Sequence, residues 1–168
     1  LQCRAKLDII WIMDGSASIS APDWTSACNF VVNFTSACTM DPQDVEVGIV
    51  QFSSTARTEI SLSSDKDSVI NAAKHMIQME QSTNQYVGFK EALKMIDMAG
   101  RTNTSGKVFI MVTDGNQNEG PDAKAAADAS KAQGVDIFAI RVGSSVDRTR
   151  IDQWVSTPVD DHSFGVSG

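Results

Sequence analysis

The sequence predicts an α/β fold: a doubly wound, mostly parallel central sheet with one antiparallel edge strand and helices on both faces. Three observations predict it. Short apolar runs alternate along the chain with helical stretches, which is typical of strand–helix–strand units. The first run, Leu7–Met13, is apolar at every position except Asp8, as expected of a strand buried on both faces. With 168 residues, the chain has the size of a single domain.

The first half of the chain supplies the strands expected at one side of the sheet. After Leu7–Met13, a helix is expected over 22–38, because apolar residues recur there at helical spacing and would face the sheet: Trp24, Ala27, Val31 and Phe34. Val45–Phe52 is the second expected strand. Ala56–Ser61 pairs with it after the turn Ser53-Ser54-Thr55, as the edge strand.

The second half continues the alternation. Helices are expected over 65–79 and 87–99, a buried strand over Lys107–Thr113, a helix over 121–133 that Gly134 stops, a strand over Val135–Val142, a short helix over 147–155 and an edge strand over 162–166. A doubly wound sheet normally ends with a helix over its last strand. Since this chain stops at Gly168, we expect the single domain 1–168 to lack its final helix.

Composition excludes several function classes. The net charge is −7 and no Lys/Arg cluster is present, which argues against a nucleic-acid partner. No apolar run approaches membrane-spanning length, so membrane insertion is not expected. The cysteines Cys3, Cys28 and Cys38 form no C-x-x-C pair, which argues against structural zinc.

Three polar segments fall where ligands sit in open α/β sheets, beyond the carboxyl ends of the strands. The first is Asp14-Gly15-Ser16-Ala17-Ser18, directly after the first strand. The second is Gln81-Ser82-Thr83-Asn84, before a helix. The third is Thr113-Asp114-Gly115, at the end of a buried strand. Their side chains are therefore expected to converge on one point.

The donors in these segments are carboxylate and hydroxyl oxygens, without His or Cys. Such a set favours Mg²⁺ or Mn²⁺, with Ca²⁺ as a further option, over zinc or copper. Asp14 and Asp114 are the carboxylates offered, and the remaining donors are neutral. A cation held this way keeps an open position and attracts one more anionic oxygen from outside. This balance of two carboxylate charges against a divalent cation predicts a partner that offers a Glu or Asp side chain.

Asp14, Ser16, Ser18, Thr83 and Asp114 together resemble the metal-ion-dependent adhesion site of von Willebrand factor A domains. The likeness covers nearly the whole chain: DIIWIMDGSASI resembles the family's first strand and loop, DVEVGIVQFSS its second strand and KVFIMVTDG its fourth. GVDIFAIRVG and STPVDDHSF are similar to the extracellular-matrix branch, as in matrilins and the A domains of type VI collagen. The resemblance implies a Rossmann-like fold with an intact metal site.

The resemblance also implies roles for the residues. Ser16 and Ser18 would bind the metal through their hydroxyls, Asp14 and Asp114 directly or through water, and Thr83 directly once a partner is engaged. This chain departs from the family around the site, with Gln81-Ser82 where Gly-Gly is common and Gln85 where a second Thr is common. The rim that would contact the partner is expected to consist of four polar residues: Asn84, Gln85, Asn116 and Glu119.

The predicted function is a metal-dependent adhesion module that grips an acidic group of a matrix or cell-surface protein, such as a collagen. A Mg²⁺-dependent phosphoryl-transfer enzyme is a weaker alternative. Haloacid-dehalogenase phosphatases need Asp-x-Asp, but position 16 is Ser, and no G-x-S-x-G elbow occurs. The chain is therefore not expected to be an enzyme. An intracellular assembly module of the same fold is the other alternative.

Cysteines and sequons favour a secreted protein. Asn33-Phe34-Thr35 and Asn103-Thr104-Ser105 are candidate glycosylation sites. A disulfide between Cys3 and Cys38 is predicted, because Cys3 precedes the first strand and the first helix returns to that edge. Cys28 and Cys38 lie about 15 Å apart along one helix, beyond bonding reach. A link from Cys3 to a cysteine beyond Gly168 is the rival pairing.

Overall fold

The computed structural model describes residues 5–101 and 106–166. The strands are β1 (Leu7–Asp14), β2 (Val45–Phe52), β3 (Ala56–Ser63), β4 (Gly106–Thr113), β5 (Val135–Arg141) and β6 (Ser163–Gly165). The helices are α1 (Ala21–Ala37), α2 (Lys66–His75), α3 (Gln85–Ala99), α4 (Ala123–Ala132) and α5 (Arg148–Trp154), with a 3-10 turn at Val159–Asp161. Within the described ranges, no helix is both long and apolar enough to cross a membrane.

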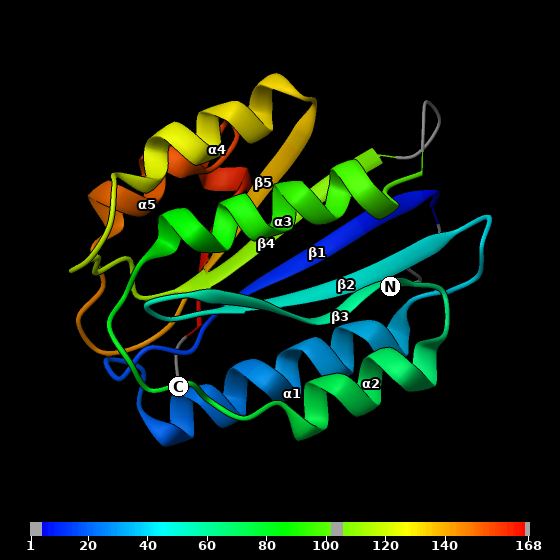
Figure 1. The fold of residues 1–168 in the computed structure, drawn as a ribbon, viewed down its shortest axis with the longest axis horizontal. Coiled ribbons are helices and arrows are strands. Elements are labelled where there is room, and N and C mark those ends of the chain that lie inside the picture. The colour runs from blue at the N-terminus through cyan, green and yellow to red at the C-terminus, as the bar shows by residue number, and fades with distance from the viewer. Residues whose placement is uncertain (1–4, 102–105, 167–168) are drawn as a thin grey trace.

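The strands form one sheet in the order β3-β2-β1-β4-β5-β6. β3 runs antiparallel to β2, and all other neighbouring strands are parallel. Figure 1 shows α1 and α2 against one face of the sheet and α3, α4 and α5 against the other. The predicted fold, with its antiparallel edge strand, is confirmed. The chain first adds strands on one side of β1 and then, from β4 onward, on the other side. The switch point therefore lies between β1 and β4, and this is where such sheets bind ligands.

Strand β1 is apolar between Asp8 and Asp14, because both of its faces are covered there. Ile9, Trp11 and Met13 pack in the core beneath α1 and α2, whereas Ile10 and Ile12 pack in the core beneath α3 and α4. Each of the five is at most 2% exposed. Burying a large apolar side chain contributes about 1.5–3 kcal/mol, so this strand anchors both halves of the core.

Helix α2 is shorter than predicted. The sequence indicated a helix over 65–79, but α2 ends at His75. The side chain of Gln51 in β2 bonds the following segment: its Oε1 accepts from the Met79 amide at 2.8 Å, and its Nε2 donates to the Ile77 carbonyl at 2.9 Å. The Glu80 amide then donates to the Gly15 carbonyl at 2.8 Å. These long-range bonds replace helical ones and lay residues 76–80 along the loop after β1.

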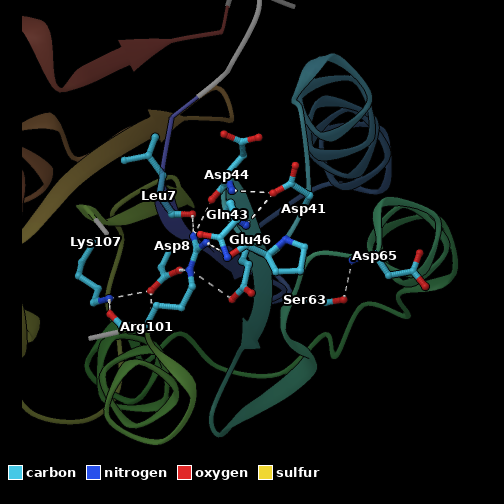
Figure 2. A network of polar contacts seen from close by, with 11 residues as sticks. Leu7, Asp8, Asp41, Gln43, Asp44, Glu46, Ser63, Asp65, Arg101 and Lys107 are labelled. Atoms are coloured by element: carbon cyan, nitrogen blue, oxygen red, sulfur yellow. Dashed lines mark hydrogen bonds and ion pairs between the residues drawn. The ribbon is translucent and has the colours of Figure 1, made fainter. Parts of the chain in front are cut away.

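At the amino-terminal ends of the parallel strands, a buried carboxylate forms hydrogen bonds that join three parts of the chain (Figure 2). Asp8, fully buried, accepts from the Arg101 amide at 2.9 Å, from Arg101 Nε at 2.8 Å and from Lys107 Nζ at 2.6 Å. Arg101 Nη2 also donates to the carbonyls of Leu7 at 2.8 Å and Asp44 at 2.7 Å. The start of β1, the residue before β2 and the connection between α3 and β4 are thereby held together.

An apolar groove lies on the sheet face that α1 covers in part. Its volume is about 320 Å³. The residues that line it come from β1, α1, β4, β5 and β6, and they include Trp11, Phe30, Phe34, Phe138 and Phe164. Phe30 and Phe164 are 43% and 48% exposed. That the single domain 1–168 lacks its final helix stays a prediction.

Candidate metal centre

The loop after β1 brings the first three predicted ligands together. Ser16 Oγ donates to Asp14 Oδ1 at 2.6 Å, and the hydroxyl oxygens of Ser16 and Ser18 are 3.0 Å apart. The turn requires glycine at position 15, because a Cβ there would lie 2.0 Å from Gln51 Oε1. Asp14 and Ser16 are buried while Ser18 is exposed, so the oxygen cluster reaches from the interior to the surface.

Thr83 is held between the other two predicted segments. Its amide donates to Asn118 Oδ1 at 2.8 Å, and its carbonyl accepts from the amides of Asn118 and Glu119, both at 3.1 Å. On the other side, the Ala17 amide donates to the Gln81 carbonyl at 2.9 Å. Thr83 is 1% exposed. The three loops that sequence analysis expected to converge are thus hydrogen-bonded to one another.

Asp114 follows β4, at the switch point next to Asp14. Its Oδ1 accepts from the Asn116 amide at 2.9 Å, and its carbonyl accepts from the Asp147 amide at 2.8 Å. Gly115 has φ +80°, and a Cβ there would lie 2.7 Å from the Asp147 carbonyl oxygen, so the turn favours glycine. Asp114 is 5% exposed. The turn therefore holds the second carboxylate in a largely buried position.

The electrostatics of Asp14 suit a cation. Burial raises the pKa of Asp14 to about 6, against hydrogen bonds from Ser16 and Thr113 that lower it, and the charge of Asp114 raises it further. Within the described ranges, no Lys or Arg forms an ion pair with either carboxylate. A divalent cation would compensate this unbalanced negative charge.

The donor set fits a hard cation that is coordinated partly by hydroxyl oxygens. In the part of the chain that the structure describes, no group of three or more His, Cys, Asp and Glu residues could bind a metal. A site here has to combine two carboxylates with serine and threonine oxygens. This chemistry matches Mg²⁺ and Mn²⁺, which prefer oxygen ligands and keep bound waters.

Sequence reasoning placed Thr113 in the third polar segment but did not predict that its side chain and that of Gln78 support this centre. Thr113 Oγ1 donates to Asp14 Oδ2 at 2.6 Å. Gln78 Nε2 donates to the carbonyls of Ser16 at 3.1 Å and Ile19 at 3.0 Å, which ties segment 76–80 to the first loop. The sequence does contain one signal for such residues: Gln51 and Thr113 are polar side chains near the ends of otherwise apolar strands.

The predicted rim residues divide into two pairs. Asn116 and Glu119 are exposed, and Asn116 Nδ2 donates to the Ser145 carbonyl at 2.6 Å. Asn84 is 7% exposed and its Oδ1 accepts from the Val87 amide as the N-cap of α3. Gln85 is fully buried, so its assignment to the rim has to be corrected. As the first residue of α3, it points inward and donates to Thr113 Oγ1 at 3.4 Å.

The predicted modification sites lie away from this edge or outside the described residues. Cys38 is buried at the end of α1, but Cys3 lies outside the described residues, so their disulfide stays a prediction. Asn33 is exposed on α1, although Thr35 of its sequon is buried. Asn103 also lies outside the described residues. Glycosylation at both asparagines stays a prediction.

Comparison with known sequences identifies relatives in matrix proteins. The family model "von Willebrand factor type A domain" matches residues 8–168. Human matrilin-1 is 30% identical over 169 residues, which cover 95% of this chain and 33% of matrilin-1. The mouse collagen alpha-1(XX) chain is 30% identical over 157 residues, which cover 91% of this chain and 12% of that one. The chain thus spans a third or less of these relatives.

Solved structures share the fold. Proximal thread matrix protein 1 from the mussel byssus, with a zinc-occupied MIDAS motif, superposes with a TM-score of 0.90 at 23% identity, over 99% of this chain and 45% of that one. Manganese-loaded Plasmodium vivax TRAP protein superposes with a TM-score of 0.82 at 18% identity, over 96% of this chain and 68% of that one. At these identities the likeness establishes the fold alone.

Proposed function

The chain belongs to the von Willebrand factor type A domain family, and from that premise we propose that it is a metal-dependent adhesion module. It holds one divalent cation through Asp14, Ser16, Ser18, Thr83 and Asp114. The cation grips an acidic side chain of an extracellular protein partner. Relatives among matrilins, collagens and integrins support a protein-binding adhesion role for the domain, and they support a binding module over an enzyme.

The convergence of the three loops carries this proposal. Oxygen atoms of Asp14, Ser16 and Ser18 lie 2.6–3.0 Å from their neighbours at the switch point of the sheet. Hydrogen bonds hold Thr83 against the loop of Asn118 and Glu119, and the nearby Gln81 carbonyl accepts from the Ala17 amide of the first loop. The charge of Asp114 raises the pKa of Asp14. Hydroxyl oxygens grouped beside Asp14, together with the second uncompensated carboxylate of Asp114, suit the coordination chemistry of a hard divalent cation.

Mg²⁺ or Mn²⁺ is the proposed cation, with Ca²⁺ as a further option. The set of oxygen donors favours these ions, and Mn²⁺ should bind at least as tightly as Mg²⁺ by the usual affinity order. The zinc and manganese found in the two structural neighbours support occupation of such a site by a divalent cation. When bound, the cation supplies an electron-poor coordination position for a partner oxygen.

The charge count explains why an acidic partner should bind. Two carboxylates cancel the +2 charge at most, and the hydroxyls of Ser16, Ser18 and Thr83 add no negative charge. An incoming Glu or Asp side chain therefore gains a Coulombic contact at a partly dehydrated site. The exposed residues Asn116 and Glu119 lie on the next loop and would set specificity. The relatives favour a matrix protein, such as a collagen, as the partner.

Binding to immobilised matrix proteins tests this function. We expect a partner to bind in Mg²⁺ and to dissociate in chelator. Thr83→Ala should weaken binding at least tenfold, because the hydroxyl would complete the coordination when a partner is engaged. Asp128→Asn is the control: this residue is exposed on α4, remote from the site. Affinity that survives both chelation and Thr83→Ala would place the partner elsewhere on the molecule.

A further inference from the structure

The hydroxyl of Thr113 has a fixed direction beneath the candidate metal centre. A hydroxyl donates one hydrogen bond and accepts two. Thr113 Oγ1 accepts from the Gly115 amide at 3.1 Å and from Gln85 Nε2 at 3.4 Å. With both acceptor positions used, its proton has to point at Asp14 Oδ2, which lies 2.6 Å away. An ionised carboxylate can only accept, so the two donors to Thr113 hold the hydroxyl in the orientation from which it donates to Asp14.

Gln85 is an unusual side chain for this position. It is fully buried, and its Oε1 is a buried acceptor that has no hydrogen-bond partner within the described ranges. An unsatisfied buried polar atom destabilises the fold, so Gln85 is a poor choice for stability alone. An apolar side chain of similar length, such as methionine, would avoid this cost. What Gln85 supplies in return is the amide proton donated to Thr113.

We propose that Gln85 is a positioning residue of the metal centre, acting through Thr113 on Asp14. This inference rests on the proposed function. The amide of Gln85 fills the last acceptor position of the Thr113 hydroxyl, and that hydroxyl then holds Oδ2 of Asp14. Meanwhile Ser16 donates from its amide at 3.0 Å and from its hydroxyl at 2.6 Å to Oδ1. Both oxygens of the carboxylate are therefore held in place before a cation arrives, which lowers the cost of assembling the site.

The test is a double-mutant cycle with Gln85→Met and Thr113→Val, both close in shape to the native side chains. Mn²⁺ affinity is measured by calorimetry, and thermal unfolding is followed for each metal-free protein in chelator. We expect Gln85→Met to weaken Mn²⁺ binding about tenfold. Its metal-free melting temperature should be unchanged or higher, because the orphaned acceptor is gone. The double variant should bind no more weakly than Thr113→Val alone, since Gln85 acts through that hydroxyl.

Three results would overturn the inference. They are unchanged Mn²⁺ affinity in Gln85→Met, losses that add in the double variant, and a fall in metal-free melting temperature that accompanies weaker binding in Gln85→Met. The last would mean that Gln85 only supports the fold. Failure of the unsubstituted chain to bind Mn²⁺ would instead overturn the proposed function, and this inference with it.

Discussion

At the residue scale, Asp14 is subject to two opposing demands. Its burial disfavours a negative charge, but a cation needs that charge to bind. Hydrogen bonds from Ser16 and Thr113 offset part of the cost, and the remainder raises the pKa of Asp14 to about 6. Sequence reasoning found Asp14, Ser16 and Ser18 because they directly follow an obvious strand. It placed Thr113 in the third polar segment but gave its hydroxyl no role, because the sequence does not show that Thr113 Oγ1 bonds Asp14 Oδ2.

Cation binding should therefore depend on pH. In the metal-free chain, the raised pKa means that folded Asp14 takes up a proton as the pH falls through about 6. A proton and a cation compete for the same carboxylate, so Mn²⁺ affinity should be about tenfold weaker at pH 5 than at pH 7. Calorimetry at pH 5, 6 and 7 measures this. Equal affinity at pH 5 and pH 7 would contradict the assignment of Asp14 as a ligand.

Raising the pH strengthens cation binding, but the same pKa shift makes the metal-free fold less stable as the pH rises. Between the ordinary value of 3.8 and about 6, folded Asp14 binds more protons than unfolded Asp14. Its contribution to the free energy of unfolding therefore falls as the pH rises through this window. Bound metal removes this cost by favouring the charged carboxylate. Metal should consequently stabilise the fold more at pH 7 than at pH 5.

At the element scale, apolar periodicity predicted the strands well. It could not predict where α2 ends or which way Gln85 points, because side-chain bonds between distant elements determine both. β2 has the predicted bounds, and β1 extends one residue beyond its prediction. The helix predicted over 65–79 ends early because Gln51 bonds the backbone of residues 77 and 79. Gln85 was placed on the rim because the sequence does not show which way the first turn of α3 faces. In each case the deciding contact lies far away in the sequence.

Asp8, Arg101 and Lys107 form a cluster at the amino-terminal ends of the parallel strands. The contribution of this cluster to the stability of the fold should be measurable. Burial alone would raise the pKa of Asp8, but hydrogen bonds from Lys107 and Arg101 outweigh it and lower the pKa below its usual value. The charge of Asp8 therefore stabilises the fold at neutral pH, and this contribution is lost as the pH falls below about 3.8 toward the folded pKa.

We expect Asp8→Asn to lower the free energy of unfolding at pH 7 by about 3 kcal/mol, because it removes the buried charge to which Arg101 and Lys107 donate. Denaturant unfolding measures this, and the difference from the unsubstituted chain should narrow below pH 3.8. Asp97→Asn, at an exposed position on α3, is the matched control and should stay within about 0.5 kcal/mol. An Asp8→Asn effect no larger than that of the control would contradict this account.

At the scale of the whole molecule, β1 connects the two polar clusters. Asp8 lies near its start and Asp14 at its end, and the apolar residues between them anchor both layers of the core. The topology therefore brings the proposed metal ligands to the switch point, where helices from both faces of the sheet begin. Fold class follows from the alternation of strands and helices alone. The convergence of the three loops follows from the topology that this alternation implies.

Cation binding by the unsubstituted chain is the measurement that tests the central claim most directly. Calorimetric titration with Mn²⁺ at pH 7 should show one cation per chain, and Asp14→Ala should abolish the heat of binding. Asp128→Asn removes the same charge on α4 and should bind as the unsubstituted chain does. Equal heats for the unsubstituted chain and Asp14→Ala, or no binding by either, would contradict the assignment of the metal centre.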